Sequence, residues 1–249
     1  GYRKNFVSAK KEPKTQRYTV SLEKGKEGVI DSKDPDKVIP FTDKRVKLLW
    51  PSMGFLSTQA LVSVSNAVGI HSEALPVPDV FTLQLARNVA SGKECIPALL
   101  VLGSFLQYLA KHKPEPDEIL LMFMPITTGP CRTGQYFVFY EQVFQEMSYD
   151  NTVVLALNSD HSYSELGSSI SLELWWGIVL ADYMMDVKTA LQVLAQDPDE
   201  AMKIFNVQWA KLLKALEKGR KKHLLPALKE TAQILAAIPK ARTMEEIKK

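Results

Sequence analysis

The chain has 249 residues and a hydrophobic content of 46%, as expected of a packed globular protein with one large domain or two smaller ones. Its longest apolar runs, at residues 119–124 and 174–180, are far shorter than the ~20 residues that span a bilayer, and its first residues lack the charged and apolar regions typical of a signal peptide. The net charge of +3 divides into basic ends and an acidic middle, and the basic segments lack the interleaved aromatic residues of a nucleic-acid-binding surface. We therefore expect a soluble, cytoplasmic protein with no membrane and no nucleic-acid partner.

Three segments of the chain differ in composition. Residues 1–44 are rich in Lys and broken by Pro and Gly, so we expect an extended basic arm or linker. Residues 45–195 alternate short apolar runs with longer helical patterns, and we expect them to form an α/β domain. Residues 196–249 are expected to form a C-terminal helical segment.

The patterns along the chain predict parallel strands separated by helices. Continuous apolar runs bounded by turn residues predict strands at 45–50, 70–75, 118–124 and 152–157. Apolar residues at helical spacing predict helices at 55–68, 79–90, 97–111, 136–147 and 168–195, followed by 200–219 and 224–238. This alternation indicates an α/β fold with a doubly wound, mostly parallel sheet and helices on both faces.

The two cysteines of the chain, Cys95 and Cys131, stand in similar local settings. In residues 91–97 (SGKECIP) and 128–134 (TGPCRTG), a glycine-containing turn delivers the cysteine to the first turn of a predicted helix. The unpaired N–H groups and positive dipole of a helix start favour a thiolate, as do the neighbouring Lys93 and Arg132. Because a thiolate is the form that binds iron or zinc, both cysteines are candidate metal ligands.

Both cysteines are expected at one edge of the sheet. Loops at the carboxyl ends of parallel strands meet at the same edge, where ligands bind in open α/β sheets. We therefore expect the sulfurs of Cys95 and Cys131 to lie within about 8 Å of each other, a separation suited to ligating one cluster. Two alternatives remain open. Both cysteines could be small buried hydrophobic residues, or one could be an enzyme's reactive thiol, although neither motif contains a histidine.

Other residues that could carry chemistry give weaker signals. Two lone histidines and two acids near a strand end could act as ligands or bases, while the acids could equally cap the next helix: His71, His161, Asp160 and Glu165. A group of large apolar residues is expected to face the core or a partner: Trp175, Trp176, Tyr183, Met184 and Met185. The motifs GxxxxGK[ST], GxGxxG, GxSxG and HExxH are missing, so nucleotide-binding, serine hydrolase and zincin functions have no motif support.

The two cysteine segments resemble those of a known family. Residues 91–97 and 129–136 (GPCRTGQY) are similar to the two cysteine motifs of the 2-hydroxyacyl-CoA dehydratase family, in the version found in CoA-substrate-specific enzyme activase-related proteins. The resemblance extends over residues 45–195. It includes the Phe-Met-Pro sequence at 123–125 and the Asn-Ser-Asp sequence at 158–160.

The resemblance implies a cluster-binding role. It implies that Cys95 and Cys131 ligate a [4Fe–4S] or double-cubane iron–sulfur cluster held between two similar α/β domains. Such a cluster receives low-potential electrons from an ATP-hydrolysing activator, in systems that dehydrate a 2-hydroxyacyl-CoA or reduce an acyl-CoA. Two thiolates are too few for a four-iron cluster. The remaining ligands are therefore expected from another protein chain or from a missing second α/β domain, which makes the chain a subunit of an oligomer or complex.

A second function remains open beside the first. The basic ends and the missing second domain favour a cluster-free interaction or adaptor module in a larger assembly. The apolar stretch 172–185 has more large side chains than one helix face can bury, which also indicates a partner.

Overall fold

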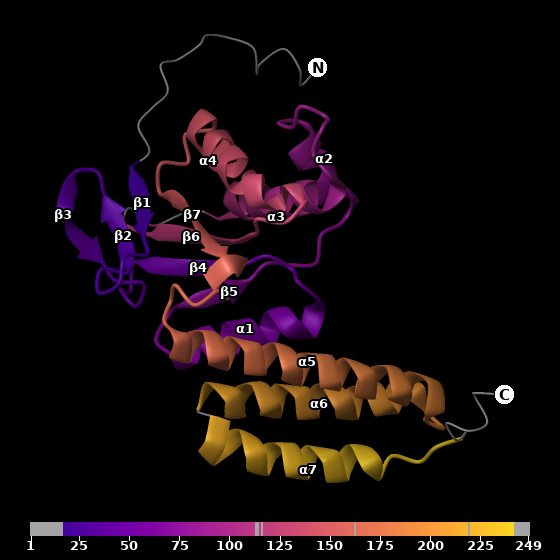
Figure 1. Cartoon of the computed structure of the whole chain (residues 1–249). Helices are drawn as coiled ribbons and strands as arrows, with labels where there is room; N and C mark the ends of the chain where they lie inside the picture. Colours follow the sequence, from indigo (N-terminus) through magenta and orange to yellow (C-terminus); the bar gives the residue numbers. More distant parts are fainter. Residues whose placement is uncertain (1–16, 113–114, 116, 162, 219, 242–249) are drawn as a thin grey trace. The chain divides into compact units, whose positions relative to one another are not determined.

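The computed structural model describes residues 17–112, 115, 117–161, 163–218 and 220–241 (Figure 1). The chain divides into two compact units. The first, here called the sheet unit, comprises Gly1–Met53 and Ile70–Ser171, and the second, the helical unit, comprises Gly54–Gly69 and Leu172–Lys249. These boundaries differ from the expected division at residue 195, because the helix after the first parallel strand and most of the long helix from Ser168 belong with the C-terminal helices.

The sheet unit contains a four-stranded parallel sheet in the order β5-β4-β6-β7. Its strands are β4 (Val46–Trp50), β5 (Ser72–Ala74), β6 (Ile119–Ile126) and β7 (Thr152–Asn158), all within the predicted segments or extending them by one or two residues. The chain adds β5 on one side of β4 and then β6 and β7 on the other, so the winding reverses between β4 and β6. The predicted α/β class, with a parallel sheet flanked by helices, is confirmed.

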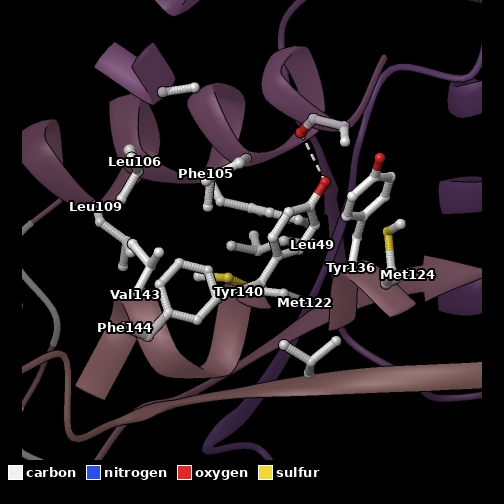
Figure 2. Packing of buried hydrophobic residues seen from close by; sticks show 14 of the residues in the cluster. Leu49, Phe105, Leu106, Leu109, Met122, Met124, Tyr136, Tyr140, Val143 and Phe144 are labelled. Atoms are coloured by element: carbon white, nitrogen blue, oxygen red, sulfur yellow. Dashed lines mark hydrogen bonds between the residues drawn. The ribbon is translucent and has the colours of Figure 1, made fainter. Parts of the chain in front are cut away.

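Helices α2 (Val80–Arg87), α3 (Ile96–Lys111) and α4 (Tyr136–Glu146) form the layer on one sheet face. Asp79 caps α2, with its carboxylate accepting the Thr82 N–H at 2.8 Å. Phe105 of α3 meets the rings of Tyr140 and Phe144 edge-on, above Met122 of β6 (Figure 2). Side chains on the other sheet face are also buried, which explains the uninterrupted apolar sequences of the strands: Leu48, Leu121, Phe123, Val153 and Leu155.

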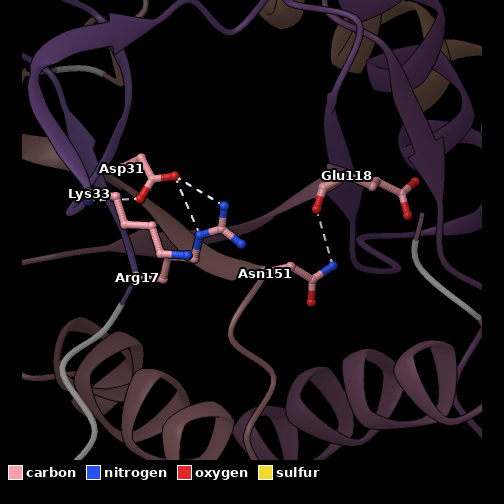
Figure 3. Close-up of polar contacts among 5 residues, drawn as sticks. All are labelled: Arg17, Asp31, Lys33, Glu118 and Asn151. Atoms are coloured by element: carbon pink, nitrogen blue, oxygen red, sulfur yellow. Dashed lines mark hydrogen bonds and ion pairs between the residues drawn. The ribbon is translucent and has the colours of Figure 1, made fainter. Parts of the chain in front are cut away.

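The N-terminal segment differs from the expected extended arm. Its described part forms a three-stranded antiparallel sheet of β1 (Tyr18–Ser21), β2 (Gly28–Asp31) and β3 (Asp34–Ile39). Arg17 pairs with Asp31 across this sheet at 3.2 Å (Figure 3). Only a few apolar side chains, including the fully buried Val29, anchor the sheet, and so few apolar positions leave little periodic signal in the sequence. Residues 1–16 of the predicted arm lie outside the described residues.

The amino end of the parallel sheet is closed by a cluster of polar contacts. The Glu118 carboxylate, just before β6, accepts from Lys47 at 2.7 Å and contacts the His112 ring at 2.6 Å. Asn151 donates its side-chain amide to the Glu118 carbonyl at 3.2 Å (Figure 3). Burial opposes ionisation of Glu118, yet the bonds from His112 and Lys47 hold its pKa below the usual value. The charged side chains at the amino end of the sheet therefore pair with one another.

The helical unit consists of α1 (Phe55–Ala67), α5 (Ser168–Leu194, from Leu172 on), α6 (Pro198–Glu217), a π-helical turn (Arg220–Leu224) and α7 (Leu225–Ala236). The Trp209 indole of α6 donates to the Gln59 side chain of α1 at 2.6 Å. Gly177 lets α5 approach α1, because a Cβ there would lie 3.2 Å from the Val64 side chain. Among the described residues, no helix is long and apolar enough to cross a membrane.

A single core substitution tests whether the N-terminal sheet is an integral part of the fold. Val29→Ala removes two methyl groups from a fully buried position, so we expect a loss of about 2 kcal/mol in the free energy of unfolding, measured by urea denaturation. Thr19→Ala, at an exposed position of β1, is the control and should change stability by less than about 0.5 kcal/mol. Equal stabilities of the two variants would indicate a loosely attached arm.

Candidate functional site at the carboxyl edge of the sheet

Both cysteines stand at helix starts, as their glycine-containing turns predict. Cys95 is the residue before α3, and Pro97 occupies the first turn of that helix. Cys131 precedes the short 3₁₀ helix η2 (Arg132–Gln135), which continues directly into α4. Since α3 leads into the start of β6 and Cys131 follows its end, both helix starts lie at the carboxyl edge of the sheet.

Two hydrogen bonds join the cysteine turns directly. The Cys95 backbone N–H donates to the Tyr136 hydroxyl at 3.3 Å. The Arg132 guanidinium donates to the Lys93 carbonyl at 2.8 Å. Below them, the buried Tyr140 hydroxyl donates to the Ala98 carbonyl at 2.7 Å, which fixes α4 against the first turn of α3 (Figure 2). The expected convergence of the two motifs is therefore present, while the separation of the two sulfur atoms stays a prediction.

Glu94 organises the turn before Cys95. Its carboxylate accepts hydrogen bonds from the backbone N–H groups of Ser91, Gly92 and Lys93 at 3.0–3.2 Å and from the Ser91 hydroxyl at 2.8 Å. Burial opposes the charged form, but these bonds lower the pKa of Glu94 below its ordinary value. The N–H groups of this turn are consequently satisfied by the chain itself. The sequence analysis did not identify this role of Glu94, although an acidic residue two positions after Gly92 could have indicated it.

Cys131 is an exposed thiol whose ionised form is stabilised locally. Its sulfur lies 3.0 Å from the Thr133 hydroxyl. The hydrogen bonds from the Thr133 side chain and backbone lower the pKa of Cys131, and the nearby Arg132 charge adds a smaller effect. The expectation that neighbouring cations would favour this thiolate was therefore incomplete, because Thr133 contributes more than Arg132.

Cys95 is half-buried and pairs with a tyrosine. A hydrogen bond with the Cys95 side chain, together with burial, raises the pKa of Tyr136 above its usual value. The Tyr136 ring is itself buried beside Met124 (Figure 2). The Tyr136 hydroxyl thus bonds the backbone of Cys95, and Tyr136 belongs to the helix that follows Cys131. The sequence identified Tyr136 as part of a motif and not as the link between the cysteines.

The end of β7 is tied to the Cys131 loop. The Thr128 hydroxyl donates to Asp160 at 2.7 Å. Glu165 accepts the Asn158 N–H at 2.9 Å through one oxygen, while its other oxygen is buried and has no hydrogen-bond partner within the part of the chain that the structure describes. These acids hold loops in place, which differs from the expected capping of the next helix. His161 follows Asp160 in the short helix η3 (Ser159–His161) and is exposed.

The remaining candidate residues are His71 and the large apolar residues of α5. His71 precedes β5, so it sits at the amino end of the sheet, where its carbonyl accepts the Leu48 N–H at 2.8 Å. The large apolar residues of α5 divide between two environments: Met184 is buried, whereas Trp175, Trp176, Tyr183 and Met185 are exposed. His71 therefore lies at the end of β5 opposite to the edge that carries the cysteines.

The side chains at this edge fit part of a metal-ligand set. Over the described ranges, no group of three or more His, Cys, Asp or Glu residues is arranged to hold a metal ion. Cys95 and Cys131 are thiol ligands of the kind that iron–sulfur clusters use, and Cys131 is biased toward the thiolate. They fit as two of the four ligands that a cubane cluster takes.

Comparisons with known proteins identify no relative: no family, no curated protein and no solved structure matches the chain.

A glycine in the second motif controls the path of the Cys131 loop. A Cβ at Gly134 would lie 2.2 Å from the Thr127 carbonyl oxygen, so Gly134→Ala must push η2 away from the end of β6. We expect this variant to slow the crosslinking of Cys95 to Cys131 by a short bifunctional thiol reagent at least about tenfold. Gly129→Ala, whose Cβ would meet only a side-chain oxygen at 3.6 Å, is the matched control and should crosslink at the wild-type rate.

The thiolate bias of Cys131 can be measured directly. In a Cys95→Ser background, the alkylation rate of Cys131 should rise with pH through a midpoint below that of an ordinary thiol, because Thr133 stabilises the charged form. Thr133→Val removes the hydroxyl donor and should move the midpoint to higher pH. Thr128→Val, whose hydroxyl bonds Asp160, should leave the profile unchanged. Coincident profiles for all three chains would show that Thr133 has no effect on the thiol.

Proposed function

We propose that this chain is an iron–sulfur electron-transfer domain or subunit in which Cys95 and Cys131 supply two ligands of one cluster. The observation that carries the proposal is the direct bonding of the two cysteine turns through Tyr136 and Arg132. Free cysteines that serve only as core residues need neither exposure nor a hydrogen bond that stabilises the thiolate, yet Cys131 has both.

The residues around the two cysteines each have a role in this proposal. Cys131 and Cys95 would bind iron as thiolates, and such a cluster supplies one-electron transfer when bound. Thr133 favours the thiolate form of Cys131 through its hydrogen bonds, and the Tyr136 hydroxyl accepts the backbone N–H of Cys95. Glu94 holds the turn before Cys95 in shape by satisfying its backbone N–H groups. These contacts make the two ligand positions rigid, as a site that must hold one geometry requires.

The remaining ligands come from outside this pair of cysteines in our proposal. A partner chain or a second α/β domain would supply them from the side on which Cys131 is exposed. By its resemblance to the dehydratase and activase proteins, the assembled system would act on a CoA thioester or related small substrate. An ATP-hydrolysing activator would deliver its electrons.

A cluster-free adaptor is the second candidate function. Several large apolar side chains of α5 are exposed in the helical unit, among them Trp175 and Trp176, and surfaces of this kind bind other proteins. An adaptor would need the α/β scaffold and this surface, but not the thiolates.

Iron and sulfide analysis separates the two functions. The full chain, purified and reconstituted with iron and sulfide without oxygen, should bind both elements and develop sulfide-to-iron charge-transfer absorption. Cys95→Ser and Cys131→Ser should each reduce bound iron to background while leaving the far-UV circular dichroism unchanged, since neither side chain is fully buried. Met185→Ser removes an exposed sulfur from α5 and is the control that should keep full iron content.

Two outcomes would contradict the iron–sulfur proposal. One is a wild-type chain that binds no iron, alone or with its native partners. The other is full iron content in Cys131→Ser. Retention of partner binding in a doubly substituted Cys95→Ser, Cys131→Ser chain, together with no iron in the wild type, would establish the adaptor.

A further inference from the structure

A groove of about 350 Å³ lies between α5 and α7, two helices of the helical unit that Figure 1 labels. Small residues border it, Ala190 on α5 with Ala232 and Ala236 on α7, so little side-chain volume fills the space between the helices. Its walls are larger apolar side chains of the same two helices: Val187, Leu191, Leu194, Leu228 and Leu235. We refer to this space as the α5–α7 groove.

The polar residue at the base of the α5–α7 groove is already paired. Thr231 of α7 lines the groove, and its hydroxyl donates to the side-chain oxygen of Gln208 of α6 at 3.4 Å. Both residues are buried. A ligand in the groove therefore meets mainly carbon atoms, and its affinity comes from the apolar surface that it removes from water.

Lys240 places a positive charge at one end of the α5–α7 groove. The segment that carries it is fixed, because Ala195 and Lys240 form a bridge and the Ala241 N–H donates to the Leu194 carbonyl at 2.8 Å. The Lys240 ammonium donates to the Ala236 carbonyl at 3.3 Å, which leaves two of its three N–H donors for a ligand. The carbonyl ends of α5 and α7 near Lys240 are thus already engaged.

The acids at the start of α6, which follows this end of α5, are balanced by another lysine. Glu200 pairs with Lys203 at 3.2 Å, and Asp197 accepts the Glu200 N–H at 3.0 Å. The bond to Glu200, followed by the charges of Asp197 and Asp199, raises the pKa of Lys203. Within the described part of the chain, no carboxylate forms an ion pair with Lys240. Its charge is available to an anion at the end of the groove.

The size and lining of the α5–α7 groove favour a small ligand. Ligand sites in proteins have volumes of roughly 300–1,000 Å³ and apolar walls with few polar groups, and this groove lies at the lower end of that range. An α-helix is about 10–12 Å across with its side chains and would need a wider groove. An alkyl chain is narrow enough, and a carboxylate at its end would complement Lys240.

We propose that the α5–α7 groove binds a fatty acid, with its alkyl chain between the two helices and its carboxylate on Lys240. The chain extends from Lys240 along α5 toward Tyr183, which lines the far end of the groove. Each CH₂ group that leaves water should strengthen binding about fourfold, so affinity should rise with chain length until the groove is full.

Filling the groove tests the position of the alkyl chain. Dodecanoate, titrated calorimetrically into the full chain below its micellar concentration, should bind as one molecule per chain and more tightly than octanoate. Ala190→Trp and Ala232→Phe fill the groove from opposite borders, and each should weaken dodecanoate binding at least about 30-fold. Ala210→Trp adds the same ring at an exposed position of α6 outside the groove and should bind as the wild type does. Circular dichroism should show that all variants are folded.

Removing the charge tests the position of the carboxylate. Lys240→Met keeps the length of the side chain and should weaken dodecanoate binding about fivefold, the effect of an exposed ion pair, while leaving dodecanol binding unchanged. Lys229→Met removes an exposed charge from α7 outside the groove and should have no effect on either ligand.

Three results would contradict the proposal. A wild-type chain that binds no dodecanoate would overturn it, as would dodecanoate binding that survives both Ala190→Trp and Ala232→Phe. A chain whose groove is filled by a second copy would form a dimer that Ala190→Trp dissociates and that dodecanoate does not affect. Equal losses for dodecanol and dodecanoate in Lys240→Met would overturn the position of the carboxylate. None of these results depends on iron binding or on the cysteines.

Discussion

The packing of α3 and α4 on one face of the parallel sheet is the constraint on which the rest of the sheet unit depends. Phe105 fills the space between the two helices and meets Tyr140 and Phe144 edge-on. The Tyr140 hydroxyl, buried in the same layer, bonds the first turn of α3. Because each helix begins next to a cysteine, the core contacts that align the helices also align Cys95 with Cys131. The candidate site is thus an extension of the core and not an independent loop structure.

Much of this arrangement could be predicted from local sequence. The uninterrupted apolar run of β6 and the Pro that follows Cys95 each have a physical reason to form a buried strand and a helix start. The N-terminal sheet could not be predicted in the same way, because β1–β3 are short and partly polar, and their stability comes from pairing across the sheet and from few buried residues such as Val29. The grouping of α1 with α5 and α6 was also hidden, since contacts between distant segments leave no local pattern.

Within the candidate site, too, some residues could be predicted from local sequence and others could not. A glycine turn before a helix marks the position of a cysteine, so Cys95 and Cys131 could be selected from the sequence alone. The groups that adjust their chemistry could not. Thr133 acts through a hydrogen bond to the adjacent thiol, and Tyr136 reaches a residue 41 positions earlier in the chain. Hydroxyl groups are so common that their presence carries no signal until the fold brings them to a partner.

The carboxylate of Glu94 has a consequence for how the Cys95 turn behaves before any ligand binds. Three successive backbone N–H groups that point to one place would otherwise attract phosphate, sulfate or another anion from solution. Because the Glu94 carboxylate already accepts hydrogen bonds from these N–H groups, anions from solution should bind this turn only weakly. The turn is also ordered when the chain folds, so the binding of a ligand to Cys95 requires no further loss of backbone entropy there. Cys95 is consequently presented by a preorganised turn whose shape does not depend on its ligand.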